Sequence, residues 1–131
     1  IRTADYLYIR NYEPERWPAG TVRIKTNEGH YGDIDASPTK NEMIEGRKTW
    51  PTLFDLSFGK RPPEELYDCT KDPDQTNNLA ADPAFQKVKK QLSERLDKRL
   101  IETGDPRATT DGAPWDDLPY YGNNRWPVLP E

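Results

Sequence analysis

The sequence predicts an α+β fold, in which a small antiparallel sheet carries one long amphipathic helix across one face. Two short stretches, residues 4–12 and 65–68, have the composition and alternation of strands. Residues 85–100 instead place apolar side chains at three- and four-residue spacing, which is the period of a helix that buries one face. Short strands followed by a single long helix favour a sheet with that helix packed on it.

The first half of the chain begins with a strand and continues into irregular structure. Within residues 4–12, Tyr6, Tyr8 and Arg10 alternate with Leu7 and Ile9. Prolines and Gly20 then interrupt the pattern. The later segments are expected to be a short strand over residues 21–25, a polar loop over 27–40 and one or two helical turns over 41–47.

The second half contains the most regular pattern in the sequence. An apolar stretch over residues 53–58 ends at Gly59, and a strand is expected at 65–68. Asp-Pro pairs at 72–73 and 82–83 are both typical of helix starts. The helical stripe consists of Phe85, Val88, Leu92, Leu96 and Leu100. We expect Gly104 to end this helix and the stripe to pack on the sheet that contains Leu7, Ile9 and Leu66.

The composition indicates a piece of a larger protein. Hydrophobic residues make up 33% of the chain, charged residues 32%, and the mean hydropathy is −1.07. Such a chain has little apolar material for a core of its own, and it begins at Ile1 rather than Met. The net charge of −4 with dispersed basic residues argues against nucleic acid as a partner. No apolar run approaches a membrane span.

Neither a metal site nor a catalytic centre is predicted. His30 and Cys69 are the only soft ligands, and they are far apart in the sequence. The acidic run at 33–37 has a weak likeness to a calcium loop, but Pro38 stands where the EF-hand turn needs glycine, and Ile44 where it needs glutamate. Cys69 has no histidine near it in the sequence, and a small buried side chain is its expected role.

The best candidate for a binding site is the loop over residues 31–40. It mixes carboxylates, hydroxyl groups and a cation on an irregular segment, where function tends to reside. Its candidate substrate-binding residues are Tyr31, Asp33, Asp35, Ser37 and Lys40. A purely structural loop, held by Pro38 and by Asp side chains bonded to nearby backbone amides, is the competing interpretation.

Several motifs, in order and spacing, resemble the C-terminal subdomain of type I sulfatases. They are PEELYD at 63–68, DP at 72–73, NNLA at 77–80, and IRT at 1–3 followed by YLYIRN at 6–11. SPT at 37–39, TGDPR at 103–107 and YYG at 120–122 are similar to the heparan N-sulfatase-like branch. The resemblance covers most of residues 1–107 and, more weakly, the remainder.

The resemblance implies a four-stranded antiparallel sheet with a helix over residues 1–107, and a tail over 108–131 packed on a catalytic domain. That upstream domain would be alkaline-phosphatase-like and would hold a formylglycine residue and calcium. Its substrate would be a sulfated glycan, and its location periplasmic, secreted or lysosomal. The motif of the modified residue is absent here, since Cys69 is followed by Thr-Lys-Asp-Pro. We therefore expect no catalytic residue and no cofactor in this piece, and no activity from it alone.

Two other functions remain open from the sequence. The first alternative to a sulfatase subdomain is a carbohydrate-binding module that stands alone. The second is the equivalent subdomain of another alkaline-phosphatase-superfamily hydrolase. In the first case the tyrosines and tryptophans would form a platform for sugar rings. In the sulfatase interpretation, the tail aromatics are expected to contact the catalytic domain; they are Trp115, Tyr120, Tyr121 and Trp126.

Overall fold

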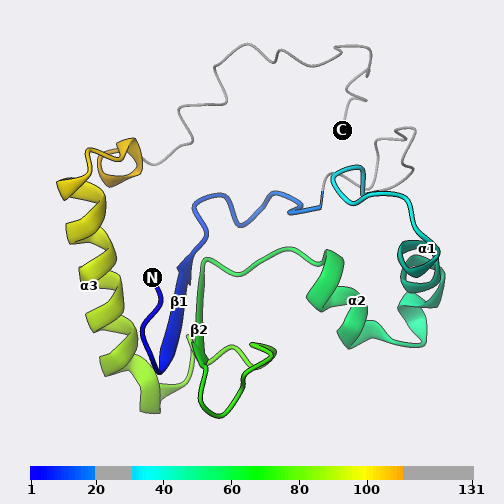
Figure 1. The fold of residues 1–131 in the computed structure, drawn as a ribbon, viewed down its shortest axis with the longest axis horizontal. Helices are drawn as coiled ribbons and strands as arrows, with labels where there is room; N and C mark the ends of the chain where they lie inside the picture. Colours follow the sequence, from blue (N-terminus) through cyan, green and yellow to red (C-terminus); the bar gives the residue numbers. More distant parts are fainter. Residues whose placement is uncertain (20–30, 111–131) are drawn as a thin grey trace. The chain divides into compact units, whose positions relative to one another are not determined.

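A computed structural model describes residues 1–19 and 31–110, which divide into two compact units. The first unit contains residues 1–13 and 62–110, and the second contains residues 14–19 and 31–61. Figure 1 labels the strands and helices. In chain order they are β1 (Tyr6–Arg10), α1 (Pro38–Glu45), the 3₁₀ helix η1 (Gly46–Lys48), α2 (Pro51–Phe58), β2 (Glu64–Asp68), the 3₁₀ helix η2 (Pro83–Phe85), α3 (Gln86–Glu102) and the 3₁₀ helix η3 (Pro106–Ala108).

The sheet of the first unit consists of β1 and β2, which pair antiparallel. The register runs from Tyr6 opposite Asp68 to Arg10 opposite Glu64. Arg2 adds one isolated bridge to β1. The α+β class is confirmed, but the part of the chain that the structure describes has two strands rather than four. The strand predicted at 21–25 lies outside the described residues, as do the tail aromatics.

Helix α3 ends where its sequence signals predict, while the Asp-Pro start signal opens the 3₁₀ helix η2, which α3 follows at Gln86. The Asp82 carboxylate accepts a hydrogen bond of 2.8 Å from the Ala84 amide, and Pro83 occupies the first position of η2. At the other end Gly104 takes a left-handed conformation with φ of 64°. The amides of Gly104 and Asp105 donate to the carbonyls of Ile101 and Leu100, which is the hydrogen-bond pattern of a Schellman motif.

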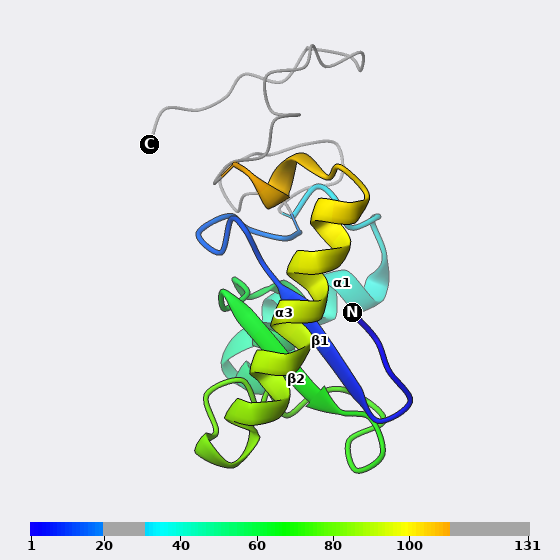
Figure 2. The ribbon, with the colours of Figure 1, turned by 90° about the vertical axis from the view of Figure 1, so that its left-hand side faces the viewer.

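The helix packs on the predicted sheet with Leu66 in the contact, and on the face of β1 that carries the tyrosines. Buried Leu92 packs with Tyr8, Leu66 and Ala80, and other residues of the stripe border this cluster. The face that α3 covers (Figure 2) therefore carries Tyr6 and Tyr8 instead of Leu7 and Ile9. The period of two was correct, but apolarity was the wrong guide to the buried face. The tyrosine ring supplies apolar area, and its hydroxyl finds a polar partner at the edge of the core.

Polar contacts fix the same helix on the sheet. The Tyr8 hydroxyl donates to Glu64 at 2.6 Å, and the Lys89 ammonium donates to the same carboxylate at 2.8 Å. Arg10 donates to Asp97 at 2.5 Å and to the Ser93 hydroxyl at 2.8 Å. These contacts join β1, β2 and α3 around the apolar cluster. Because charge-assisted bonds are directional, they favour one placement of the helix.

No helix forms at the Asp-Pro pair 72–73, so that prediction was wrong. The Asp72 carboxylate accepts from the Asn77 amide, five residues away, at 2.8 Å. Gln75 adopts a left-handed conformation with φ of 56°, which a continuing helix excludes. Asp72 thus closes a turn, and helical structure begins only at the second Asp-Pro pair. Within residues 1–19 and 31–110, no helix has the length and apolar content needed to cross a bilayer.

The second unit is helical and lacks a sheet in its described residues. Ser37 caps α1 by accepting from the Lys40 amide at 3.1 Å, and Pro38 occupies the first helical position. The helix expected at 41–47 exists but starts three residues earlier, so the predicted loop ends at Ser37. The apolar stretch 53–58 belongs to α2, which also begins with a proline.

Candidate functional site

Three of the five candidate residues of the loop have structural contacts. Tyr31 lies in the core of the second unit, where its ring centroid is 4.8 Å from that of Phe58 and 6.0 Å from that of Phe54. Burial raises the pKa of its hydroxyl, and the nearby charge of Arg47 partly offsets this. The ring is only 7% exposed. A face so covered is not a platform for a sugar ring.

Lys40 is buried and fixes the loop through its side chain. Its ammonium donates to the backbone carbonyls of Tyr31 at 3.0 Å and Ile34 at 2.5 Å. A buried ammonium needs such acceptors, because its desolvation is otherwise costly. Ser37 is engaged as the cap of α1. These contacts favour a structural role for the side chains of Lys40 and Ser37. They hold the loop where it meets the core and where it enters α1.

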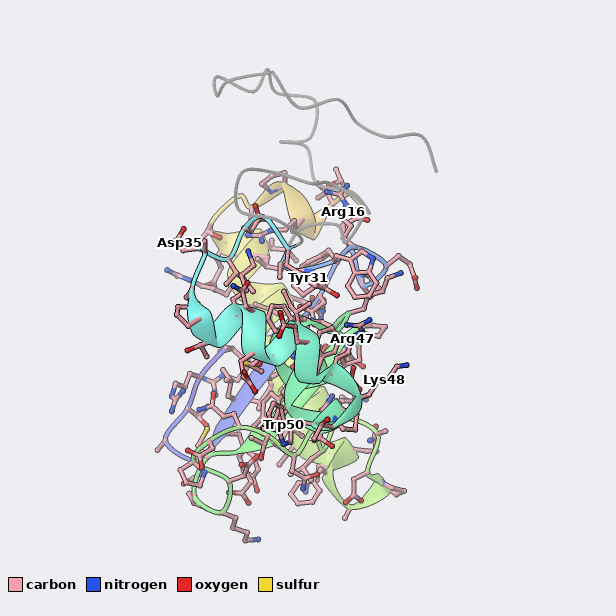
Figure 3. The ribbon with its side chains drawn as sticks, turned by 90° about the vertical axis from the view of Figure 1, so that its right-hand side faces the viewer. Arg16, Tyr31, Asp35, Arg47, Lys48 and Trp50 are labelled. Carbon is pink, nitrogen blue, oxygen red and sulfur yellow. The ribbon has the colours of Figure 1, made fainter. Side chains whose placement is uncertain are left out.

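Of the five candidate residues, Asp33 and Asp35 are the exposed ones. Asp33 lies between the two residues whose carbonyls bind Lys40, and Asp35 lies between Ile34 and the start of α1, so the held loop presents both to solvent. Figure 3 shows Asp35 at the outer turn that leads into α1. Carboxylates placed in this way can accept hydrogen bonds from the hydroxyl groups of a ligand. In the described part of the chain no three His, Cys, Asp or Glu side chains lie close enough together to hold a metal ion.

The acidic pair at 64–65 does not form a catalytic dyad. The two residues are neighbours in β2, and successive side chains of a strand point to opposite faces. Glu64 faces Lys89 and Tyr8, whose hydrogen bonds lower its pKa. Glu65 accepts from the Tyr67 hydroxyl and from Asn11 on the other face. Both carboxylates therefore serve as hydrogen-bond acceptors within the first unit.

The remaining motif residues of β2 and of the turn that follows it also make structural contacts. The Asn78 side chain accepts from the amides of Leu66 and Ala80, both at 2.9 Å, and so pairs with the strand like a further piece of backbone. The Asp68 carboxylate accepts from the Thr70 amide and hydroxyl. Cys69 follows β2 and is half-buried, with its amide bonded to the Asp5 carbonyl. These contacts hold β2 and the turn that follows it.

One exposed aromatic residue was not among the predicted site residues. Trp50 follows η1 after Thr49, and it is 43% exposed. An open cavity of about 260 Å³ lies beside it, lined by Met43, Trp50, Leu53 and Phe54. The signal was present in the sequence as Arg-Lys-Thr-Trp-Pro at 47–51. It was overlooked because no periodic element included it.

Comparison with known proteins identifies relatives among the sulfatases. An ulvan-active sulfatase of Formosa agariphila is 31% identical over 98% of this chain and 20% of its own length. A second ulvan-active sulfatase of the same organism is 28% identical over 80% of this chain and 17% of its own length. Human N-sulphoglucosamine sulphohydrolase is 48% identical over 42 residues, which are 32% of this chain and 8% of that protein.

The matches to the two ulvan-active sulfatases cover most of this chain but only a small part of each relative. The chain spans about a fifth of the length of the relative that it matches over 98% of its residues. No family model matches the chain. No solved structure matches it either. The similarity to several sulfatases, together with the PEELYD and NNLA motifs whose contacts are described above, shows that the chain belongs to the sulfatase family and corresponds to a C-terminal piece of such an enzyme.

Proposed function

We propose that the whole protein is a sulfatase acting on a sulfated glycan, and that the described second unit contributes to binding the glycan rather than to cleaving the sulfate. The observation that carries this proposal is the 31% identity with an ulvan-active sulfatase over 98% of the chain. The sequence has no formylglycine motif, so the nucleophile and the calcium ion would belong to an alkaline-phosphatase-like domain elsewhere in the protein. The comparisons do not favour a separate carbohydrate-binding module or a phosphoesterase subdomain.

Within this function, we assign Asp33 and Asp35 to glycan recognition. Both are exposed, and the buried contacts of Tyr31 and Lys40 hold the loop that carries them. A rigid loop loses little conformational entropy on binding, so hydrogen bonds from its carboxylates to sugar hydroxyls retain more of their free energy. Ser37 acts through the cap of α1. The predicted set of five residues is thus divided into two that contact ligand and three that position them.

The assignment is tested by kinetics of the full-length enzyme. Asp33→Asn and Asp35→Asn keep the side-chain shape and remove the charge, and we expect each to raise KM for a sulfated oligosaccharide several-fold, with a smaller effect on a small aryl sulfate. Asp55→Asn, an exposed carboxylate on α2, is the matched control and should leave both substrates unaffected. Equal losses on both substrates would indicate a folding role. Unchanged kinetics on the oligosaccharide would remove the loop from the binding site.

A finer assignment concerns the sulfate group that is removed. The 48% identity with the N-sulphoglucosamine enzyme over 42 residues supports a heparan N-sulfatase-like branch. The longer matches are to sulfatases named for ulvan, so both kinds of linkage require testing. We expect the full-length enzyme to release sulfate from an N-sulfated glucosamine disaccharide. Release from ulvan oligosaccharides alone would place the protein outside that branch.

A further inference from the structure

Trp17 is an exposed aromatic residue at the border of the core of the second unit. Its ring centroid lies 6.4 Å from that of the buried Tyr31, and the two ring planes meet at 69°. The residue nevertheless remains 36% exposed. Because the indole contacts a ring of the core, its exposed part is held in one orientation and offers an apolar surface to a ligand.

A lysine lies over the same indole. The Lys60 ammonium is 5.6 Å from the centroid of the Trp17 ring, which is within the range of a cation–π contact. The backbone before Lys60 lies close against the end of α2. The Gly59 amide donates to the Asp55 carbonyl at 2.9 Å, and a Cβ atom added at Gly59 would lie 2.6 Å from that carbonyl oxygen. The fold therefore presents the ring and the cation together.

The charge of Lys60 is paired with a carboxylate at the surface. Its ammonium donates to Glu15 at 3.2 Å, and the two side chains are 41% and 90% exposed. So exposed an ion pair contributes at most about 1 kcal/mol, because water screens it and two flexible side chains must be ordered. An anionic group of a ligand can therefore replace Glu15 with little loss of free energy, while the indole stays beside the ammonium.

The ring and the cation lie next to the loop that we assign to glycan binding. The Asp33 amide donates to the carbonyl of Ala19 at 3.4 Å, and Ala19 closely follows Trp17 in the chain. Tyr31, at the start of the loop, contacts the Trp17 ring. A glycan whose hydroxyl groups bind Asp33 thus meets an aromatic surface and a cation beside it. The aromatic face suits the C–H groups of a sugar ring, and the ammonium suits an anionic substituent.

We infer that Trp17 and Lys60 form a subsite for an acidic sugar residue of the glycan. The indole contacts the sugar ring, and the ammonium binds a carboxylate or a retained sulfate in exchange for Glu15. The inference rests on the proposed action of the whole protein on a sulfated glycan. It assigns to the enzyme a preference for glycans that carry an anionic group besides the sulfate that is removed.

The test uses three oligosaccharides of equal length and the full-length enzyme. Each carries one scissile sulfate. The first has no other anionic group, the second adds the carboxylate of a uronic acid, and the third adds a sulfate that is not cleaved. We expect Lys60→Gln to raise KM about three- to tenfold for the second probe, the third or both, and to leave KM for the first unchanged. The probe that is affected identifies the anion, and Lys60→Arg should retain most of the affinity for it.

The effect of Glu15→Gln should have the opposite sign. This change removes the carboxylate that competes for Lys60, so KM for the same anionic probe should fall about two- to fivefold. An ion pair that only stabilised the fold would not produce this gain. Trp17→Ala should raise KM about three- to tenfold for all three probes, because the contact with the sugar ring is lost, and Trp17→Phe should recover part of the loss.

Lys48→Gln is the matched control, because Lys48 is an exposed cation of the same unit. It should leave KM for all three probes unchanged, and thermal unfolding of each variant separates binding from stability. If the wild-type enzyme cleaves the probes and Lys60→Gln alters KM for all three equally or for none, the subsite is refuted while the proposed function stands. A higher KM for the anionic probe after Glu15→Gln would also refute it. If the wild-type enzyme cleaves none of the probes, the proposed function itself fails.

Discussion

The two units of this chain use their aromatic residues in opposite ways. In the first unit the side chains of Tyr6 and Tyr8, on β1, pack in the cluster under α3, and the Tyr8 hydroxyl donates to Glu64. In the second unit a cluster around Tyr31 and Phe58 forms the core, while Trp50 stays at the surface. In the first unit the specific contacts therefore stabilise one arrangement of the strands and the helix. The second leaves groups available for a ligand, which is why we place binding there.

The largest expected effect comes from emptying either core. Phe58→Ala should cost about 3–5 kcal/mol, and Leu92→Ala about 2–5 kcal/mol, because each leaves a cavity in a packed cluster. Hydrogen exchange would locate the damage: Phe58→Ala should expose the amides of α1 and α2, and Leu92→Ala those of β2 and α3. Leu53→Ala, at an exposed site, is the control and should change stability by less than about 0.5 kcal/mol. Equal loss of protection in both units after either substitution would show that they unfold as one.

A second effect separates the buried cation of the second unit from an exposed one. Lys40→Met keeps most of the side-chain volume but leaves the carbonyls of Tyr31 and Ile34 without their donor. We expect a loss of about 1–3 kcal/mol in the free energy of unfolding. Lys48→Met, at an exposed position, should change it by less than about 0.5 kcal/mol. Denaturant unfolding of the two variants measures the difference, and similar values for both would contradict the buried role of Lys40.

Two glycines offer a smaller and sharper contrast. Gly104→Ala should cost about 1 kcal/mol, because an alanine strains at φ of 64° although a Cβ would meet nothing within 4 Å. Gly104→Asn should recover part of this loss, since asparagine tolerates the left-handed region. Gly46→Ala acts through space instead and should displace the Trp50 indole, which a shift in tryptophan fluorescence would report. A Gly46→Ala variant with unchanged fluorescence would mean that the ring is not held there.

The last predicted effect is a loss of stability in acid, where carboxylates of the first unit become protonated. In the first unit hydrogen bonds lower the pKa of Glu64, Asp68 and Asp72, and the Arg107 side chain lowers that of Asp105 to about 2. A carboxyl group with a lower pKa in the folded state adds stability that is complete above its unfolded pKa. That stability is lost as the pH falls through the folded value.

The sign of the pH effect gives a direct experiment. We expect the unfolding free energy of the first unit to be flat above about pH 5 and to decrease from there towards pH 2. Glu64→Gln should make the decrease shallower, because it removes one of the titrating groups. Unfolding monitored by exchange in β2 and α3 at several pH values measures the slope. A stability that rises on acidification would contradict the assigned contacts.

Local signals explain why the first unit was the more predictable one. Helix α3 has an apolar stripe and a terminal glycine, and an aspartate caps the 3₁₀ turn η2 that leads into it; each of these signals acts over a few residues of the chain. Apolarity alone does not decide which face of β1 is buried, because a tyrosine can be buried when its hydroxyl has a partner, and Glu64 is 56 residues away from Tyr8. Asp72 was misread for a similar reason. Its carboxylate could cap a helix or close a turn, and the left-handed Gln75 decides for the turn.

In the candidate site the sequence shows the residue types but not which of them are buried. Residues 31–40 combine two aspartates, a serine before a proline, a tyrosine and a lysine. It could not show that Lys40 turns inward, because its acceptors are backbone carbonyls, and every residue carries one. Trp50 was missed because its position depends on the bare backbone of Gly46 four residues earlier.

The sequence by itself determined the long helix and its ends, the two strands, the α+β class and the sulfatase resemblance, since each depends on residue types at short, fixed spacing. Only the tertiary structure decided which face of β1 is buried, which loop residues remain exposed, and which aromatic ring stays accessible. Those outcomes depend on groups distant in sequence that satisfy one another's hydrogen bonds and fill one another's volume. A buried polar atom must find a partner, and the partner's identity is set by the fold.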